Sequence, residues 1–388
     1  MQSGRKTPLL MLPGPTNVPD EVLKAMQMGI INHRGDDFHK LYEEITEGLK
    51  YVFQTEQEVF TLTASGTGAV ETAISNVIKP GDNVLVLVNG EFGERAAKMA
   101  EIFGGKVYKL TADYGYAILP GMLEDFLERN KNMDVMVFVY NETSTGVRNP
   151  ARELVSIAKD HGLLTICDAI SNLGGDYLYM DKWGIDVVVS GSQKCIAAPP
   201  GLSFIALSDD AWKKVERNDS RRNYYFDLIR IREFHERRET PFTPAISLFY
   251  ALKVALELIR EEGLENRIKR HIVCSKALRE GLRSLNLKLL VKDEEFASRT
   301  VTAVINPDNI LDSEIRKLML DKYNIAIAGG MGKLKGKIFR VGTMGIINRD
   351  LVIRFLEALE NVLRELGYDI TEMGKSLVVA NNVFERNS

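Results

Sequence analysis

Helix-like and strand-like segments alternate along the chain up to about residue 208. The strand-like segments are short apolar runs rich in β-branched residues, as at 83–88 and 134–140, whereas apolar residues recur at helical spacing in segments such as 120–130. The same patterns predict further strands at 56–63, 106–110, 163–168 and 186–190, and further helices at 69–78, 93–103 and 150–161. Strands that alternate with helices in this way indicate an α/β fold with a doubly wound, mainly parallel sheet.

The alternation ends after residue 208. Residues 221–239 are densely charged, with aromatic and aliphatic side chains between the charges, and 247–262 and 264–284 are predicted as two long helices. From residue 300 the pattern becomes strand, helix, strand, Gly/Lys-rich loop, strand and helix, which predicts a smaller α+β domain at the C-terminal end. The tail 367–388 has no clear pattern, and we expect its last turn to be disordered.

Composition and charge argue against several classes of function. The 388 residues carry 50 Lys and Arg against 53 Asp and Glu, so nothing favours binding to nucleic acid or to an anionic membrane. No apolar run approaches the roughly 20 residues of a membrane span. The 5 histidines lack metal-ligand spacing, and the 3 cysteines include no CxxC pair, which argues against a zinc site and a disulfide framework. We therefore expect a cytoplasmic protein without a metal.

Two loops that follow predicted strands carry candidate chemistry. Ser65, Gly66 and Thr67 precede the helix predicted from residue 69, where small residues and free N–H groups suit an anion; an ordinary turn with a Ser or Thr cap is the alternative. Asp168 ends a strand of uncharged residues, so it is either a helix cap or a buried charge that needs a cationic partner. Taken alone, each loop leaves both interpretations open.

Lys194 lies in the most informative segment, SGSQKC at 190–195, which is followed by an apolar, uncharged stretch. Burial lowers the pKa of a lysine, as an amine that forms a Schiff base requires, although a snorkelling lysine at a strand end is the alternative. A pyridoxal phosphate (PLP) site needs a helix N-terminus for the phosphate, an acid at the pyridine nitrogen and such a lysine. The segment 65–67, Asp168 and Lys194 supply these three parts.

Motifs over nearly the whole chain resemble those of the fold type I, class V aminotransferases, in the alanine–glyoxylate / serine–pyruvate aminotransferase group. They are PGPTNVP (13–19), HRG (33–35), SGTGAVE (65–71), NGEFGER (89–95), NETSTGV (141–147), CDAISNLGG (167–175), SGSQKCIAAPPG (190–201), TPAISL (243–248) and FRVGTMG (339–345). The resemblance implies a PLP-dependent aminotransferase with the PLP transferase fold of type I. It divides the chain into an N-terminal segment (1–20) that packs with the small domain, a large PLP-binding domain (21–255) and a small C-terminal domain (256–388).

The resemblance also implies a role for each residue that matches a family motif. Lys194 would bind the cofactor covalently and move the proton, and Asp168 would pair with the pyridine nitrogen. The phosphate would be held by Ser65, Gly66, Thr67, Gln193 and, from a neighbouring subunit, Thr243. Thr143 would lie near the ring hydroxyl, while Phe92, where the family often has tryptophan, and Ile170 would cover the two ring faces. Arg340 would grip the substrate α-carboxylate in a bidentate fork, and Gly14 would contact the substrate.

Assembly and substrates follow from the same resemblance. A composite site implies a homodimer, although Thr240 stands where the better-known animal members have a tyrosine that reaches the neighbouring phosphate. The substrates would be a small amino acid, serine or alanine, and a 2-oxo acid, pyruvate or glyoxylate. A 2-aminoethylphosphonate–pyruvate aminotransferase is the alternative, and a cysteine desulfurase-like enzyme or a non-catalytic PLP-binding protein has less support.

Overall fold

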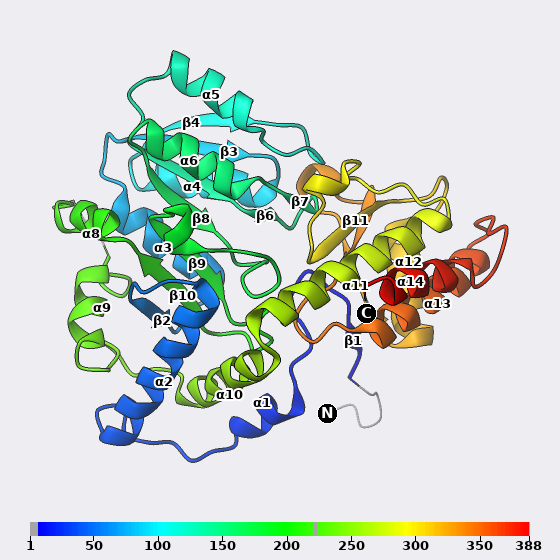
Figure 1. The fold of residues 1–388 in the computed structure, drawn as a ribbon, viewed down its shortest axis with the longest axis horizontal. Coiled ribbons are helices and arrows are strands. Elements are labelled where there is room, and N and C mark those ends of the chain that lie inside the picture. The colour runs from blue at the N-terminus through cyan, green and yellow to red at the C-terminus, as the bar shows by residue number, and fades with distance from the viewer. Residues whose placement is uncertain (1–6, 221–222, 388) are drawn as a thin grey trace.

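The computed structural model describes residues 7–220 and 223–387, arranged in two groups of elements (Figure 1). Residues 1–6 of the predicted N-terminal segment, 221–222 of the charged stretch and 388 of the tail lie outside this description. The first group is built on a seven-stranded sheet. In spatial order its strands are β2 (Val59–Leu62), β10 (Ser203–Leu207), β9 (Val187–Gly191), β8 (Leu164–Asp168), β5 (Val135–Val139), β3 (Asn83–Val88) and β4 (Lys106–Thr111).

Most neighbouring strands of this sheet are parallel, which confirms the predicted α/β class. Only β10 runs antiparallel to its neighbours β9 and β2. The remaining pairs are parallel, and their register places the C-terminal ends of β5, β8 and β9 side by side, with Val139 opposite Asp168 and Asp168 opposite Val189. Ligands of open α/β sheets bind at the C-terminal ends of the strands, so the topology predicts a ligand site beside β5, β8 and β9.

Helices cover both faces of the sheet because successive strand side chains point to opposite sides. In β3, Val84 and Val86 pack in one core, whereas Leu85 and Leu87 pack in the other. The first core includes α3 (Gly66–Val77), α4 (Glu91–Ile102), α8 (Asp209–Glu216) and α9 (Leu228–His235). The second includes α1 (Asp20–Ala25), α2 (Asp36–Phe53), α5 (Pro120–Arg129), α6 (Ala151–Asp160), α7 (Met180–Trp183) and α10 (Ile246–Glu262).

The second group contains a three-stranded antiparallel sheet with helices packed on it. Its strands, in spatial order, are β11 (Val301–Ile305), β14 (Ile338–Gly342) and β13 (Ala328–Gly329). Its helices are α11 (Leu264–Ser284), α12 (Asp312–Tyr323), α13 (Arg349–Glu365) and α14 (Lys375–Glu385), with short 3-10 turns at Glu294–Phe296 and Gly332–Leu334. Figure 1 shows α11 running from the first group into the second, and its residues contribute to the cores of both groups.

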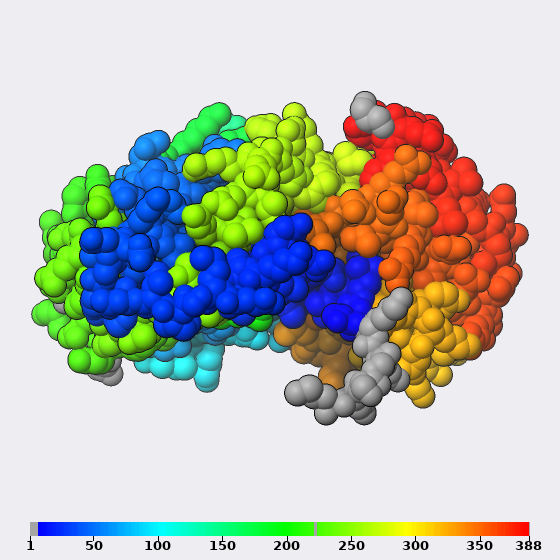
Figure 2. Space-filling view, turned by 90° about the horizontal axis from the view of Figure 1, so that it is seen from below, coloured from blue at the N-terminus to red at the C-terminus, as the bar shows by residue number. Residues whose placement is uncertain are grey.

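The N-terminal segment also connects the two groups. Its strand β1 (Leu9–Leu10) pairs in parallel with β12 (Ile325–Ala326) of the second group, and Met11 is buried in that group's core. Figure 2 shows the N-terminal residues, in blue, lying along one face from the first group to the second. The domain boundaries at residues 20 and 255 stay predictions.

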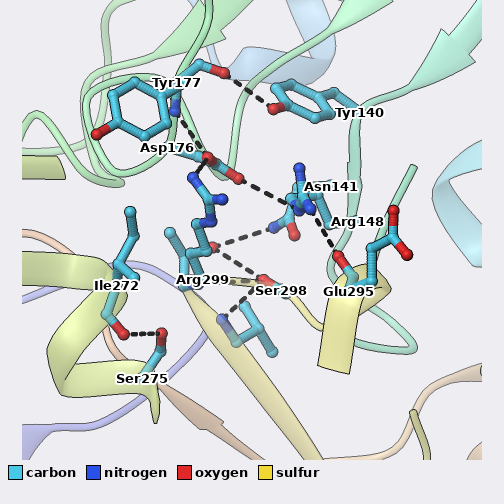
Figure 3. A network of polar contacts seen from close by, with 12 residues as sticks. Tyr140, Asn141, Arg148, Asp176, Tyr177, Ile272, Ser275, Glu295, Ser298 and Arg299 are labelled. Carbon is cyan, nitrogen blue, oxygen red and sulfur yellow. Dashed lines mark hydrogen bonds and ion pairs between the residues drawn. The ribbon is translucent and has the colours of Figure 1, made fainter. Parts of the chain in front are cut away.

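A polar network around the buried carboxylate of Asp176 joins the two groups (Figure 3). Asp176, whose side chain is buried, forms an ion pair of 2.5 Å with Arg299, which leads into β11. Arg148, in the short hairpin of β6 (Asn141–Glu142) and β7 (Val147–Arg148), lies 3.8 Å from the same carboxylate and donates to the carbonyl oxygen of Glu295. Because these contacts cross from one group to the other, they hold the edge of the sheet against β11.

Three features differ from the sequence-based predictions. The tail, which had no clear sequence pattern, forms helix α14, because Ala380, Val383 and Phe384 pack into the second core. The end of the last turn, at residue 388, lies outside the described residues. Strand β10 lies in the uncharged stretch after Lys194, which the sequence left without a predicted element. Helices α3 and α4 begin earlier than expected, at Gly66 and Glu91. In the described part of the chain, no helix is long and apolar enough to span a membrane.

Candidate active site

A pocket with an empty volume of about 620 Å³ lies at the C-terminal edge of the sheet. It is formed by the loops after β2, β3, β5, β8 and β9, where the parallel topology predicts ligands to bind. Nine of the residues predicted from the sequence line it together: Ser65, Gly66, Thr67, Phe92, Thr143, Asp168, Ile170, Gln193 and Lys194. The fold therefore brings segments that are far apart in the sequence to one cavity.

The N-terminus of α3 forms one wall of this pocket. Ser65 is the N-cap residue in an extended conformation, and its side chain makes no capping hydrogen bond within the described chain. The first N–H groups of an α-helix have no intrahelical partner, so they are available to an anion. Gly66 packs against Ile170, because a Cβ atom there would lie 2.8 Å from Cδ1 of Ile170 and would require that side chain to shift.

Asp168 ends β8 and presents a carboxylate to the pocket. Its Oδ1 accepts a hydrogen bond of 2.9 Å from the backbone N–H of Ile170, and no described residue donates to Oδ2. Burial raises the pKa of Asp168 to about 6, while the Ile170 N–H and the Lys194 ammonium act in the opposite direction. A cationic N–H group placed at Oδ2 would favour the ionised carboxylate.

Lys194 lies opposite Asp168, three residues after β9. The pKa of its amine is lowered to about 8, mainly by burial. The nearby positive charge of Arg340 also lowers this pKa, whereas Cys195 and Asp168 raise it. Its Nζ donates a hydrogen bond to the carbonyl oxygen of Pro13. Gly14 packs directly on the lysine side chain, where a Cβ atom would overlap it, so the N-terminal segment reaches the site through this glycine.

Arg340 is buried in β14, outside the pocket lining but close enough to lower the pKa of Lys194. Its Nε and Nη1 donate hydrogen bonds of 2.9 Å to the carbonyl oxygens of Gly329 and Thr143. Among the described residues, no carboxylate forms an ion pair with its guanidinium. Burial lowers the pKa of Arg340 to about 10, and the nearby negative charge of Glu142 acts in the opposite direction without forming an ion pair.

Three predicted site residues do not line the pocket: Arg340, Gly14 and Thr243. Arg340 and Gly14 lie close to Lys194, whereas nothing in the described chain connects Thr243 to the pocket. Thr243 is exposed and lies three residues before the start of α10. Thr240, by contrast, is buried, and its hydroxyl donates a 2.7 Å hydrogen bond to the carbonyl oxygen of Phe242. Arg34, from the HRG motif, pairs with Glu239 at 2.6 Å and thus stabilises this loop.

Several further residues in or beside the pocket had no predicted role. Arg95 lines it, with its guanidinium carbon 4.8 Å from the centre of the Phe92 ring. Asn141 and Ser171 line it as well and hydrogen bond to each other at 2.7 Å. Glu142, just behind the lining, is fully buried and contacts the start of α4. Their only sequence signal is that they lie inside the motifs NGEFGER, NETSTGV and CDAISNLGG.

These residues fit PLP. The helix N-terminus at Gly66 suits the phosphate. The buried Oε1 of Gln193 is an acceptor that has no donor in the described part of the chain. Asp168 presents a free carboxylate oxygen for the pyridine nitrogen, and Lys194 carries an amine whose lowered pKa suits covalent attachment. The helix N-terminus, Asp168 and Lys194 thus match the phosphate, the pyridine nitrogen and the aldehyde of the cofactor.

Comparisons with known proteins agree with this chemistry. Residues 9–340 match the family described as aminotransferase class-V. An uncharacterized aminotransferase of Methanocaldococcus jannaschii is 46% identical over 367 residues, covering 94% of this chain and 95% of that protein. Serine–glyoxylate aminotransferase of Methylorubrum extorquens is 34% identical, covering 97% and 96%. The solved structure of an alanine–glyoxylate aminotransferase from a Nostoc species is similar with a TM-score of 0.90, 34% identity and coverage of 94% and 97%.

Proposed function

The chain belongs to the class V aminotransferases, enzymes that use PLP, and on this premise we propose that it transfers the amino group of serine or alanine to glyoxylate or pyruvate. Two relatives with matching length support this substrate class, since one acts on serine and glyoxylate and the other on alanine and glyoxylate. The observation that carries the proposal is Arg340, a buried cation without a carboxylate partner in the described chain.

Lys194, Asp168 and Arg340 each have a distinct role in the proposed transamination. When bound, PLP supplies an electron sink for the negative charge that develops at the substrate Cα. Nζ of Lys194 moves the proton released at that atom, because its lowered pKa keeps a share of the amine neutral. Oδ2 of Asp168 holds a proton on the pyridine nitrogen, with Oδ1 fixed by the Ile170 N–H. Arg340 orients the substrate carboxylate through the guanidinium N–H groups that the Gly329 and Thr143 carbonyls leave free.

Arg340→Lys is expected to raise KM for the amino donor by about tenfold or more, because lysine keeps the charge but loses the fork that holds a carboxylate at two points. The measurement is steady-state kinetics with alanine and with serine at saturating PLP. Arg354→Lys, an exposed change in the same group of elements, serves as the control. An unchanged KM with normal kcat in Arg340→Lys would remove this arginine from the substrate site.

The alternative substrate, 2-aminoethylphosphonate, differs in the acid group that the cation must hold. A panel of amino donors, each mixed with the PLP form in a single turnover, separates the two possibilities by the rate at which the cofactor absorbance changes. We expect serine or alanine to convert the cofactor fastest. A desulfurase route lacks a suitable thiol, because Cys167, Cys195 and Cys274 are all buried and none lies on an exposed loop.

We further expect a homodimer whose sites are composite, with Thr243 of one subunit near the phosphate held by the other. The support is its exposure, because a site residue that contacts nothing in its own pocket is available to a second copy. Thr243→Val should weaken PLP affinity by about tenfold and leave the melting temperature nearly unchanged. Titration of the apoprotein with PLP measures the affinity, and sedimentation measures the assembly of the active species.

Thr240→Val is the matched control for this prediction. Its hydroxyl already donates to the Phe242 carbonyl within its own chain, so we expect near-normal PLP affinity. A fully active monomer that retains PLP tightly would contradict the composite site. If PLP affinity falls equally in both threonine variants, the effect comes from a change in the loop and not from a phosphate contact of Thr243.

A further inference from the structure

Helix α4, which carries Phe92 into the pocket, is capped by residues from another part of the chain. Its own N-cap, Gly90, provides no side chain. Instead, Oε2 of Glu142 accepts hydrogen bonds of 3.1 Å from the backbone N–H groups of both Phe92 and Gly93, and Oγ of Ser144 accepts one of 3.0 Å from Glu91. The first three N–H groups of the helix are therefore all satisfied by the turn after β5, and this explains why the helix starts at Glu91.

The Glu142 carboxylate makes four hydrogen bonds and acts as acceptor in each. Besides the two helix amides on Oε2, its Oε1 accepts from the backbone N–H of Ser144 at 3.0 Å and from the Ser144 hydroxyl at 2.5 Å. The side chain is fully buried. Burial raises the pKa of Glu142, and the four hydrogen bonds act against that rise. Because only the ionised form accepts at both oxygens, this arrangement suits a carboxylate, and the positive end of the helix dipole compensates its charge.

The same turn also contacts Arg340, the residue proposed to bind the substrate carboxylate. Thr143, which lies between Glu142 and Ser144, accepts the 2.9 Å hydrogen bond from Nη1 of Arg340. The negative charge of Glu142 also raises the pKa of Arg340. At the start of α4, Gly90 leaves space for the side chains of Glu142 and Ser144. A Cβ atom at Gly90 would lie 2.5 Å from Oγ of Ser144 and would overlap the Glu142 carboxylate.

We infer that Glu142, with Ser144, is a positioning residue for the transamination site, one that sets the place of Phe92 and of Arg340 together. Through the α4 cap it orients Phe92 toward the cofactor ring, and through Thr143 it orients the guanidinium toward the substrate carboxylate. The inference rests on the proposed roles of Phe92 and Arg340. It predicts that one buried carboxylate, which contacts neither cofactor nor substrate, affects the affinity for both.

Glu142→Gln tests this because glutamine cannot make the same four hydrogen bonds. Its NH₂ group would face the N–H groups of Phe92 and Gly93 if it replaced Oε2, or the N–H of Ser144 if it replaced Oε1. At least one buried N–H group would lose its acceptor and the turn would shift. We expect the Kd for PLP and the KM for the amino donor each to rise by about tenfold, with kcat at saturation changed less.

The chain contains a control, a second buried glutamate that caps a helix in a similar way with three hydrogen bonds and does not line the pocket. Glu360 of α13 accepts hydrogen bonds from the N–H of Gly374 at 2.6 Å, the N–H of Ser376 at 3.1 Å and the Ser376 hydroxyl at 2.5 Å, and so caps α14. Glu360→Gln removes an equivalent cap, so it should lower the melting temperature of the apoprotein as Glu142→Gln does. We expect it to leave PLP affinity and KM at wild-type values.

The experiment measures three quantities for each variant: the melting temperature of the apoprotein, the Kd from titration of the apoprotein with PLP, and KM and kcat for the donor. If Glu142→Gln fails to fold, Ser144→Ala decides the matter, because it keeps the carboxylate and removes only the hydroxyl, with Ser376→Ala as its control. A lowered melting temperature with Kd and KM within about twofold of wild type would overturn the inference and leave Glu142 a structural cap.

Phe92→Leu separates failure of this inference from failure of the proposed function. If Phe92→Leu leaves the Kd for PLP unchanged, the role of Phe92 at the cofactor ring is wrong and the inference falls with it. If Phe92→Leu weakens PLP binding whereas Glu142→Gln and Ser144→Ala do not, the proposed role of Phe92 stands and only the positioning role of Glu142 is wrong.

Discussion

Lys194→Ala is expected to reduce transamination at least about a thousandfold, because one amine both holds the cofactor and moves the proton at the substrate Cα. Among the described residues that line the pocket, Lys194 is the only lysine, so no other primary amine is placed to replace it. The measurements are steady-state turnover with alanine or serine and the visible absorbance of the purified holoprotein, which should lose the band of the covalently held cofactor.

Lys98→Ala is a suitable control, because Lys98 is exposed on α4 and lies outside the pocket lining. It should leave both turnover and absorbance unchanged. Turnover of Lys194→Ala within about tenfold of wild type would contradict the assignment, because the loss of a general base costs about a hundredfold or more. Lys194 would then be a buried lysine at a strand end.

Asp168→Asn is expected to lower kcat by several orders of magnitude while PLP stays bound. Asparagine keeps the shape and can still accept the Ile170 N–H, but it then turns an NH₂ group toward the pyridine nitrogen and removes the negative charge. The ring nitrogen should lose its proton, and with it much of the electron-withdrawing power of the cofactor. Each tenfold loss in kcat corresponds to about 1.4 kcal/mol of barrier.

Asp186→Asn separates this catalytic effect from the loss of a buried carboxylate in general. Asp186 is also buried, but it directly precedes β9 and so lies at the N-terminal ends of the strands, away from the pocket. There it forms an ion pair of 2.9 Å with Lys159. We expect Asp186→Asn to lower the melting temperature and to leave kcat near wild type. If Asp168→Asn keeps kcat near wild type as well, Asp168 is a strand-end cap.

Local sequence patterns were sufficient for much of the first group of elements. The strand at Asn83–Val88 was predicted to the residue, and the helix at Pro120–Arg129 to within one residue. Apolar periodicity depends on residues a few positions apart in the sequence, so it can be recognised without knowledge of the fold. Parallel topology then places the ends of β5, β8 and β9 at one edge, which is why Asp168 and Lys194 could be predicted to meet.

Other features depend on segments that meet only in the folded chain. Glu142 accepts the N–H of Phe92 across 50 residues, and no local pattern indicates that helix α4 should begin two residues before its predicted start. The Gly/Lys-rich loop gave no sign that Arg340 would be buried, because its burial comes from β11 and β13 on either side of β14. Helix α14 likewise depends on distant segments, because its apolar residues pack in the second core and Glu360 accepts a hydrogen bond from the N–H group at its N-cap, Gly374.

Local periodicity was therefore enough to predict the class of fold, and motifs of contiguous residues were enough to predict the PLP chemistry through their resemblance to a family. The roles of the individual site residues stay predictions. How those residues are held became visible only in the folded chain. The N-terminal segment contacts Lys194, the turn at Glu142 contacts both Phe92 and Arg340, and Thr243 is exposed. The physical reason is that hydrogen-bond satisfaction and burial are set by whichever groups the complete fold places in contact, and these groups are distant in sequence.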